Sequence, residues 1–160
     1  MRELFEVAEL VKVAVEDERT GVAFYSALAQ AARTQKMRGL FEGLAKQETF
    51  HQARFEKMLA DLGGVQAREQ YEGEYIAYLR TMTGTRAFPD TETALRLAAQ
   101  CTSDPAAVDL ASRFERDTLM LLNELRGMVP EKDKSIVDDI TREEQAHLTV
   151  LAEAHSGLPA

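Results

Sequence analysis

The stretch Phe41–Leu62, FEGLAKQETFHQARFEKMLADL, decides the fold. Alternating steps of three and four residues select one stripe of a helix, and this stripe is apolar except at its centre. The stripe consists of Phe41, Leu44, Glu48, His51, Phe55, Met58 and Leu62. Burying an unpaired charge is costly, so Glu48 and His51 need a partner. They lie about one helical turn apart, so both can bind one metal ion, as Glu-x-x-His pairs do in di-metal helical bundles.

Composition and charge narrow the possible partners. The net charge is −8 and no basic patch stands out, which argues against nucleic acid and against an anionic membrane surface as partners. A single cysteine, Cys101, excludes an internal disulfide and a cysteine-only iron–sulfur or rubredoxin-type site. The N-terminus MRELFEVAELVKVAVEDE carries charges throughout, and no apolar run is long enough to span a bilayer. We therefore expect a cytoplasmic protein.

The whole chain, 1–160, is predicted to be one all-α domain. The first antiparallel hairpin is expected over about 3–62, with its first long helix over about 4–32 and a stop at Gly63-Gly64. A long crossover over about 65–102 is expected to contain short helices in YEGEYIAYLRTM and TETALRLAAQ. The second hairpin is expected over about 104–156, where Ser103 caps its first helix ahead of Pro105.

The second hairpin repeats the buried charges of the first. Its last helix carries a second Glu-x-x-His, Glu144 and His147, in the middle of an apolar stripe. One charged residue also interrupts the stripe of each hairpin's first helix, Glu18 in one and Glu115 in the other. A single pair would also fit a helix with an exposed Glu and a half-buried His. Two equivalent pairs indicate instead a duplicated hairpin that builds one site.

The expected site contains four carboxylates and two imidazoles in one layer of the core. Without metal the carboxylates would repel one another and take up protons, whereas two divalent ions balance their charge with neutral imidazoles. Carboxylates with one histidine per metal suit iron or manganese better than the thiolate-rich sites of structural zinc. Manganese or zinc remain possible substitutes for iron. The predicted ligands are Glu18, Glu48, His51, Glu115, Glu144 and His147, with Glu48 and Glu144 as bridges.

Other residues near these positions have a structural interpretation beside a functional one. Tyr25, two turns past Glu18, is more often a core residue but can hydrogen-bond a ligand carboxylate or supply an electron. Gly21 and Thr118 lie one turn past Glu18 and Glu115, and their small size predicts room for a small oxidant beside the metals. The Thr118 hydroxyl can hydrogen-bond peroxide. Glu143 points about 100° away from its neighbour Glu144, so we expect it on a solvated face.

The two hairpins together resemble the rubrerythrins of the ferritin-like superfamily. The resemblance rests on AVEDERTGVAFYSALAQAA, KQETFHQARFEKMLADLGG and SRFERDTLMLLNELRGMVPEKDKSIVDDITREEQAHLTVL. It implies a ferritin-like four-helix bundle, two antiparallel hairpins joined by a crossover, with a di-iron centre at the six ligands above. It also implies a homodimer that reduces peroxide, and Tyr25 matches a tyrosine common on the family's first helix.

Two departures from the family pattern shape the functional expectation. The sequence contains one cysteine up to Ala160, so we expect no rubredoxin-type domain and expect electrons from a separate donor such as a rubredoxin. An extra glutamate near the third-helix ligand is also missing, because Ser112 and Thr118 flank Glu115 at that spacing. We expect a redox protein that reduces peroxide or dioxygen. The alternative is non-enzymatic iron binding, sensing or storage.

Overall fold

The computed structural model describes residues 2–62 and 90–158, with side chains from Val7 onward. The elements are α1 (Arg2–Ala31), α2 (Gln35–Asp61), α4 (Thr91–Ala99), α5 (Asp104–Met128) and α6 (Glu131–Ser156). Within these two ranges the chain forms helices and no strand. The all-α prediction is therefore confirmed, and the short helix expected in TETALRLAAQ is α4.

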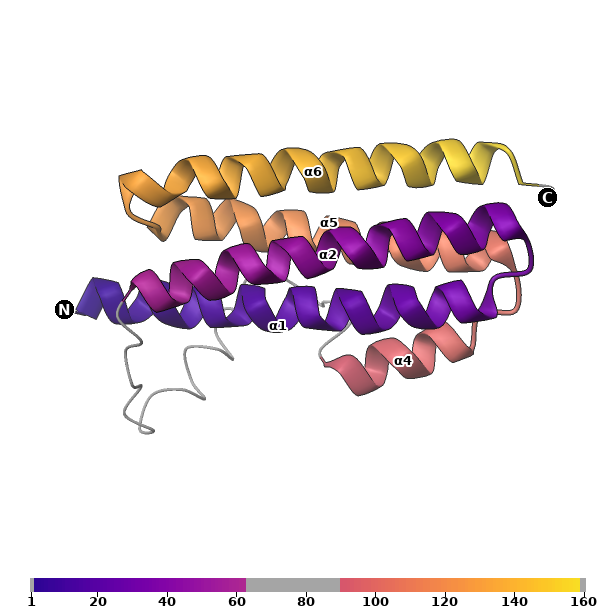
Figure 1. Cartoon of the computed structure of the whole chain (residues 1–160), viewed down its shortest axis with the longest axis horizontal. Coiled ribbons are helices and arrows are strands. Elements are labelled where there is room, and N and C mark those ends of the chain that lie inside the picture. Colours follow the sequence, from indigo (N-terminus) through magenta and orange to yellow (C-terminus); the bar gives the residue numbers. More distant parts are fainter. Residues whose placement is uncertain (1, 63–89, 159–160) are drawn as a thin grey trace.

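Four long helices lie side by side along the molecule (Figure 1). Helices α1 and α2 form one antiparallel hairpin, and α5 and α6 form the other. The hairpins meet where α1 contacts α5 and where α2 contacts α6, while α4 lies against α1. This is the arrangement of a ferritin-like bundle. The predicted stop at Gly63-Gly64 and the predicted helix at 71–82 fall outside the described residues.

Local sequence signals set where the helices begin. Thr34 caps α2 by accepting a hydrogen bond from the Met37 amide at 3.2 Å. Ser103 caps α5 by accepting one from the Ala106 amide at 3.3 Å, as the sequence predicts. The Asp104 carboxylate accepts from the Arg33 amide at 3.1 Å, which ties the turn of the first hairpin to the start of the second.

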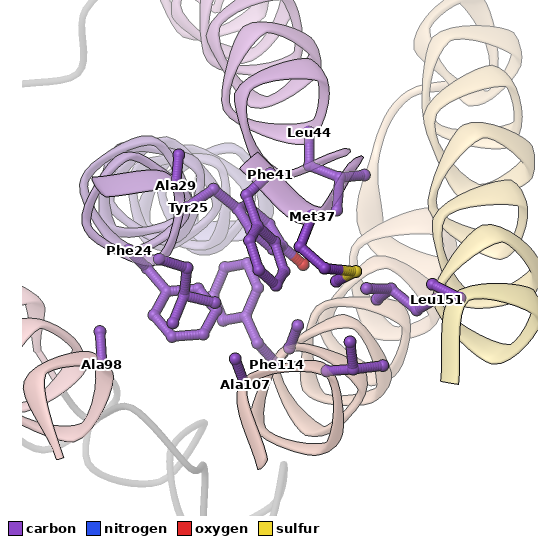
Figure 2. Close-up of a cluster of buried hydrophobic side chains, with 14 of the residues drawn as sticks. Phe24, Tyr25, Ala29, Met37, Phe41, Leu44, Ala98, Ala107, Phe114 and Leu151 are labelled. Carbon is purple, nitrogen blue, oxygen red and sulfur yellow. The ribbon is translucent and has the colours of Figure 1, made fainter. Parts of the chain in front are cut away.

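Two apolar clusters fill the bundle on either side of a polar layer. The first gathers the rings of Phe24, Tyr25, Phe41 and Phe114 between α1, α2 and α5 (Figure 2). Their ring centres lie 5.1 to 6.3 Å apart, the spacing of favourable aromatic pairs. The second cluster contains Val7, Leu10, Val11, Ala14, Val15, Phe55, Met58, Leu121, Leu122, Leu125, Val129, Val137 and Ile140. Together the clusters enclose the polar layer, whose side chains are buried from solvent.

No helix in the described part of the chain is long and apolar enough to cross a membrane.

Candidate metal centre

The six predicted ligands meet in the polar layer between the two apolar clusters. Glu18 comes from α1, Glu48 and His51 from α2, Glu115 from α5, and the remaining pair from α6. Each side chain is at most 2% exposed. They form two groups of ligand atoms, each group within 4.8 Å. One group is Glu18, Glu48, His51 and Glu144, and the other is Glu48, Glu115, Glu144 and His147.

Glu48 and Glu144 belong to both groups, as bridging carboxylates must. The Glu144 oxygens divide between the histidines, Oε1 lying 2.7 Å from His51 Nδ1 and Oε2 2.8 Å from His147 Nδ1. Glu48 lies 3.4 Å from His51 Nδ1 and 3.6 Å from His147 Nδ1. The layer thus has an approximate two-fold arrangement. That these residues bind metal stays a prediction.

The inward-facing atoms fit a pair of metal ions. Both oxygens of Glu18, Glu48 and Glu144 are buried without a hydrogen-bond partner among the described residues. The Nδ1 atoms of the two histidines likewise have no hydrogen-bond partner among the described residues, although carboxylate oxygens of Glu144 lie 2.7 and 2.8 Å from them. Buried polar groups are almost always satisfied in folded proteins. These unsatisfied oxygen and imidazole nitrogen atoms gather in the two ligand groups, and they are the donor atoms that iron and manganese prefer.

The outer face of each histidine ring is held by a residue of the other hairpin. His51 Nε2 lies 2.7 Å from Glu143 Oε2, and Arg54 donates to the other oxygen of Glu143 at 3.0 Å. His147 Nε2 lies 2.7 Å from Gln47 Oε1. Each partner oxygen can only accept, so Nε2 carries a proton, and Nδ1 can present its lone pair inward when a metal ion takes the place of its own proton.

The prediction for Glu143 is therefore wrong in part. Its side chain is 40% exposed, but its carboxylate reaches across to His51. From the sequence no role is predicted for Gln47, the outer partner of His147. Both residues directly precede the glutamate of a Glu-x-x-His pair. This repeated position is the only sequence signal that could have indicated them, since a helical wheel places it off the buried stripe.

Tyr25 is fully buried and its hydroxyl donates a hydrogen bond to Glu115 Oε1. Burial raises the pKa of the Tyr25 hydroxyl well above its usual value, and the nearby Glu115 charge raises it further. The tyrosine therefore stays protonated as a donor to the predicted ligand. This is the first of the two uses expected from the sequence, and its use as an electron source stays a prediction.

The expected space beside Gly21 is absent. A Cβ atom built on Gly21 would lie 3.1 Å from Glu48 Cγ and 3.1 Å from the Phe114 ring. The glycine therefore admits the Glu48 side chain and leaves no room for an oxidant. Thr118 is 1% exposed and its hydroxyl donates to Asp17 Oδ2 at 3.3 Å. Its predicted contact with peroxide stays a prediction.

The charges in the metal-free layer are tightly coupled. Burial raises the pKa of Glu115 to about 8, helped by the Glu144 charge. Burial and the charges of Glu144 and Glu18 raise the pKa of Glu48 well above its usual value. Burial opposes the charged form of His147, but the Glu115 and Glu144 carboxylates outweigh it and raise its pKa to about 9. Without metal, the layer therefore retains protons that two cations would replace.

We expect the metal-free protein to lose stability as the pH rises from 5 to 9. Glu115 and His147 both have raised pKa values in the folded state, so their stabilisation is present at low pH and is lost towards about 8 and 9. Each proton contributes a slope of up to about 1.4 kcal/mol per pH unit between its unfolded and folded pKa. Urea unfolding in the presence of a chelator measures this slope.

A variant at Glu115 tests this assignment. Glu115→Gln fixes the neutral form of that side chain and also removes one of the two carboxylates that raise the pKa of His147, so the slope between about pH 5 and 9 should flatten. A free energy of unfolding that stays constant or rises over this range would contradict the assignment. Metal-loaded protein should behave in the opposite way, because metal binding releases these protons and strengthens with pH.

Comparison with known proteins gives one family. A family model described as Rubrerythrin matches residues 9–155. This range includes both groups of predicted ligands and both outer partners of the histidines. Neither the curated proteins nor the solved structures gave a significant match to the chain.

Proposed function

The chain belongs to the rubrerythrin family, and we propose that it binds two iron ions in the polar layer and reduces peroxide or dioxygen there. The observation that carries the proposal is the pair of buried ligand groups that share Glu48 and Glu144. Two divalent ions would balance the four carboxylates while both imidazoles stay neutral. Manganese or zinc would satisfy the same charge balance, so the choice of iron rests on the family.

The residues of the layer would have different roles in this proposal. Glu18 and Glu115 would each hold one ion, and Glu48 and Glu144 would lie between the ions. The iron pair, when bound, supplies two-electron redox chemistry towards a small oxidant. Tyr25 holds Glu115 through its hydroxyl, and the surrounding apolar clusters keep bulk water out.

We propose that electrons come from a separate donor, such as a rubredoxin. The sequence contains one cysteine, Cys101, which cannot supply the four thiolates of a rubredoxin iron site. We further propose that the protein acts as a homodimer, as the family resemblance implies.

Thr118 bears on how efficiently peroxide would be reduced. Thr118 and Ser112 flank Glu115 at the spacing where the family resemblance implies an extra glutamate, and the Thr118 hydroxyl is hydrogen-bonded to Asp17. A hydroxyl is a poor neutral ligand for iron, so this position offers no seventh carboxylate. We therefore propose a measurable reaction with peroxide that is slower than in relatives with that glutamate.

Anaerobic iron titration followed by rapid mixing tests the proposal. We expect two iron ions per chain, and faster reoxidation of the reduced protein by peroxide than by dioxygen in stopped-flow absorbance. Saturation at one ion would contradict the two-ion site. Uptake of many ions per chain by a shell-forming oligomer would favour storage instead. Loading with zinc provides the control, since zinc fills the same ligands without redox chemistry.

A further inference from the structure

The two predicted metal positions have different surroundings despite their similar ligands. On one side the outer partner of His51 is the carboxylate of Glu143, which Arg54 holds in place. On the other side the outer partner of His147 is the neutral amide of Gln47. The residue equivalent to Arg54, three positions after His147, is the exposed apolar Val150. The two hairpins thus have the same predicted ligands but different outer hydrogen-bond partners for their histidines.

A charged acceptor changes the strength of a histidine ligand. A carboxylate that accepts a hydrogen bond from Nε2–H draws this proton away from the ring. The electron density that Nδ1 can donate to a metal therefore increases. An amide oxygen does this more weakly because it carries no net charge. His51 is therefore the stronger ligand of the two.

Glu18 and Glu115, the carboxylates that each belong to one ligand group only, differ in the same direction. Glu115 Oε1 accepts a hydrogen bond from the Tyr25 hydroxyl, and this withdraws negative charge from the oxygen. Neither oxygen of Glu18 has a hydrogen-bond partner among the described residues. The position equivalent to Tyr25, two turns past Glu115, is the apolar Leu122. A cation at Glu18 would therefore meet a carboxylate without a hydrogen bond, whereas Glu115 already accepts one.

We propose that the two metal positions fill in order, with the first ion bound at Glu18 and His51 and the second at Glu115 and His147. Glu143 and Gln47 are positioning residues that set this order through the histidines. The inference rests on the proposed two-ion site and adds which half of it binds more tightly. Outer partners of metal ligands change metal affinity by about 10- to 100-fold, so we expect a preference of at least about tenfold.

The order of filling can be observed without any turnover. Zinc is added in steps to the full-length protein labelled with ¹⁵N-histidine, and the ring nitrogen resonances are recorded by NMR. At one equivalent the Nδ1 resonance of His51 should move, and that of His147 should move only with the second equivalent. The third histidine, His155, is half exposed and lies outside both ligand groups, so its resonance provides an internal reference.

Exchanging the outer partners should weaken the preference for His51. Glu143→Gln should lower the share of the first equivalent at His51, and the double variant with Gln47→Glu should lower it further and raise the share at His147, while the difference between Glu18 and Glu115 stays. Glu153→Gln removes an exposed charge from the same helix and should leave the wild-type distribution intact. Simultaneous movement of both resonances in the wild type, or an unchanged distribution in the double variant, would overturn the inference. No movement of either resonance after two equivalents would instead refute the two-ion site.

Discussion

Replacing Glu144 with alanine should abolish binding of both metal ions and leave the helical circular dichroism unchanged. Glu144 belongs to both ligand groups, and its two oxygens lie 2.7 and 2.8 Å from the two histidine Nδ1 atoms. Its loss therefore removes one ligand from each ion and one of the four balancing charges. Metal analysis after anaerobic iron loading and desalting measures the effect. Glu153→Ala, an exposed change on the same helix, should retain two ions per chain.

Glu48 and Glu144 should differ in the metal-free protein although both are predicted bridges. Burial opposes ionisation of Glu144, but His147 and His51 outweigh it and lower its pKa, so its charge holds both protonated rings. Burial and the neighbouring carboxylates instead raise the pKa of Glu48, which favours its neutral form. Glu48→Gln should therefore be neutral or stabilising without metal, and Glu144→Gln should destabilise by leaving buried charges unpaired. Retention of two ions by Glu144→Ala, or the reverse order of stabilities, would contradict the predicted roles.

Adding one methyl group at Gly21 should weaken both the fold and the metal centre. The new Cβ would meet Glu48 Cγ and the Phe114 ring at 3.1 Å, and Phe114 is itself held between Phe24 and Tyr25. Overpacking of a buried site typically costs about 1–3 kcal/mol. Because Glu48 has to move and belongs to both ligand groups, Gly21→Ala should also lower the affinity for both ions. Chemical unfolding of the metal-free protein and anaerobic iron titration measure the two effects.

Gly43 supplies a control for this prediction with the same chemical change. It lies within α2, and nothing stands within 4 Å of an added Cβ. Gly43→Ala should therefore stabilise the protein by about 0.5–1 kcal/mol, because alanine loses less backbone entropy in a helix than glycine. If Gly21→Ala were also stabilising and still bound two ions, the close approach at Gly21 would not constrain the Glu48 side chain.

The helices and the composition of the polar layer could be predicted from the sequence. A helix repeats its faces every 3.6 residues, so the apolar stripes identified which side chains point inward. Charged residues such as Glu48 and His51 then stood out because burying them needs a compensating partner. The repeat of this pattern at Glu144 and His147 indicated that two hairpins share one layer. These inferences depend only on local geometry and on the cost of burying charge.

Only the tertiary structure decided how the second hairpin completes the first. Glu143 and Gln47 lie off the buried stripes, and they reach the opposite histidine because α2 and α6 pack together at a particular rotation. The contact of Gly21 with Glu48 likewise depends on the distance between α1 and α2. Helical periodicity fixes the direction of a side chain relative to its own axis. The rotation and spacing of neighbouring helices come from how all of their side chains pack together.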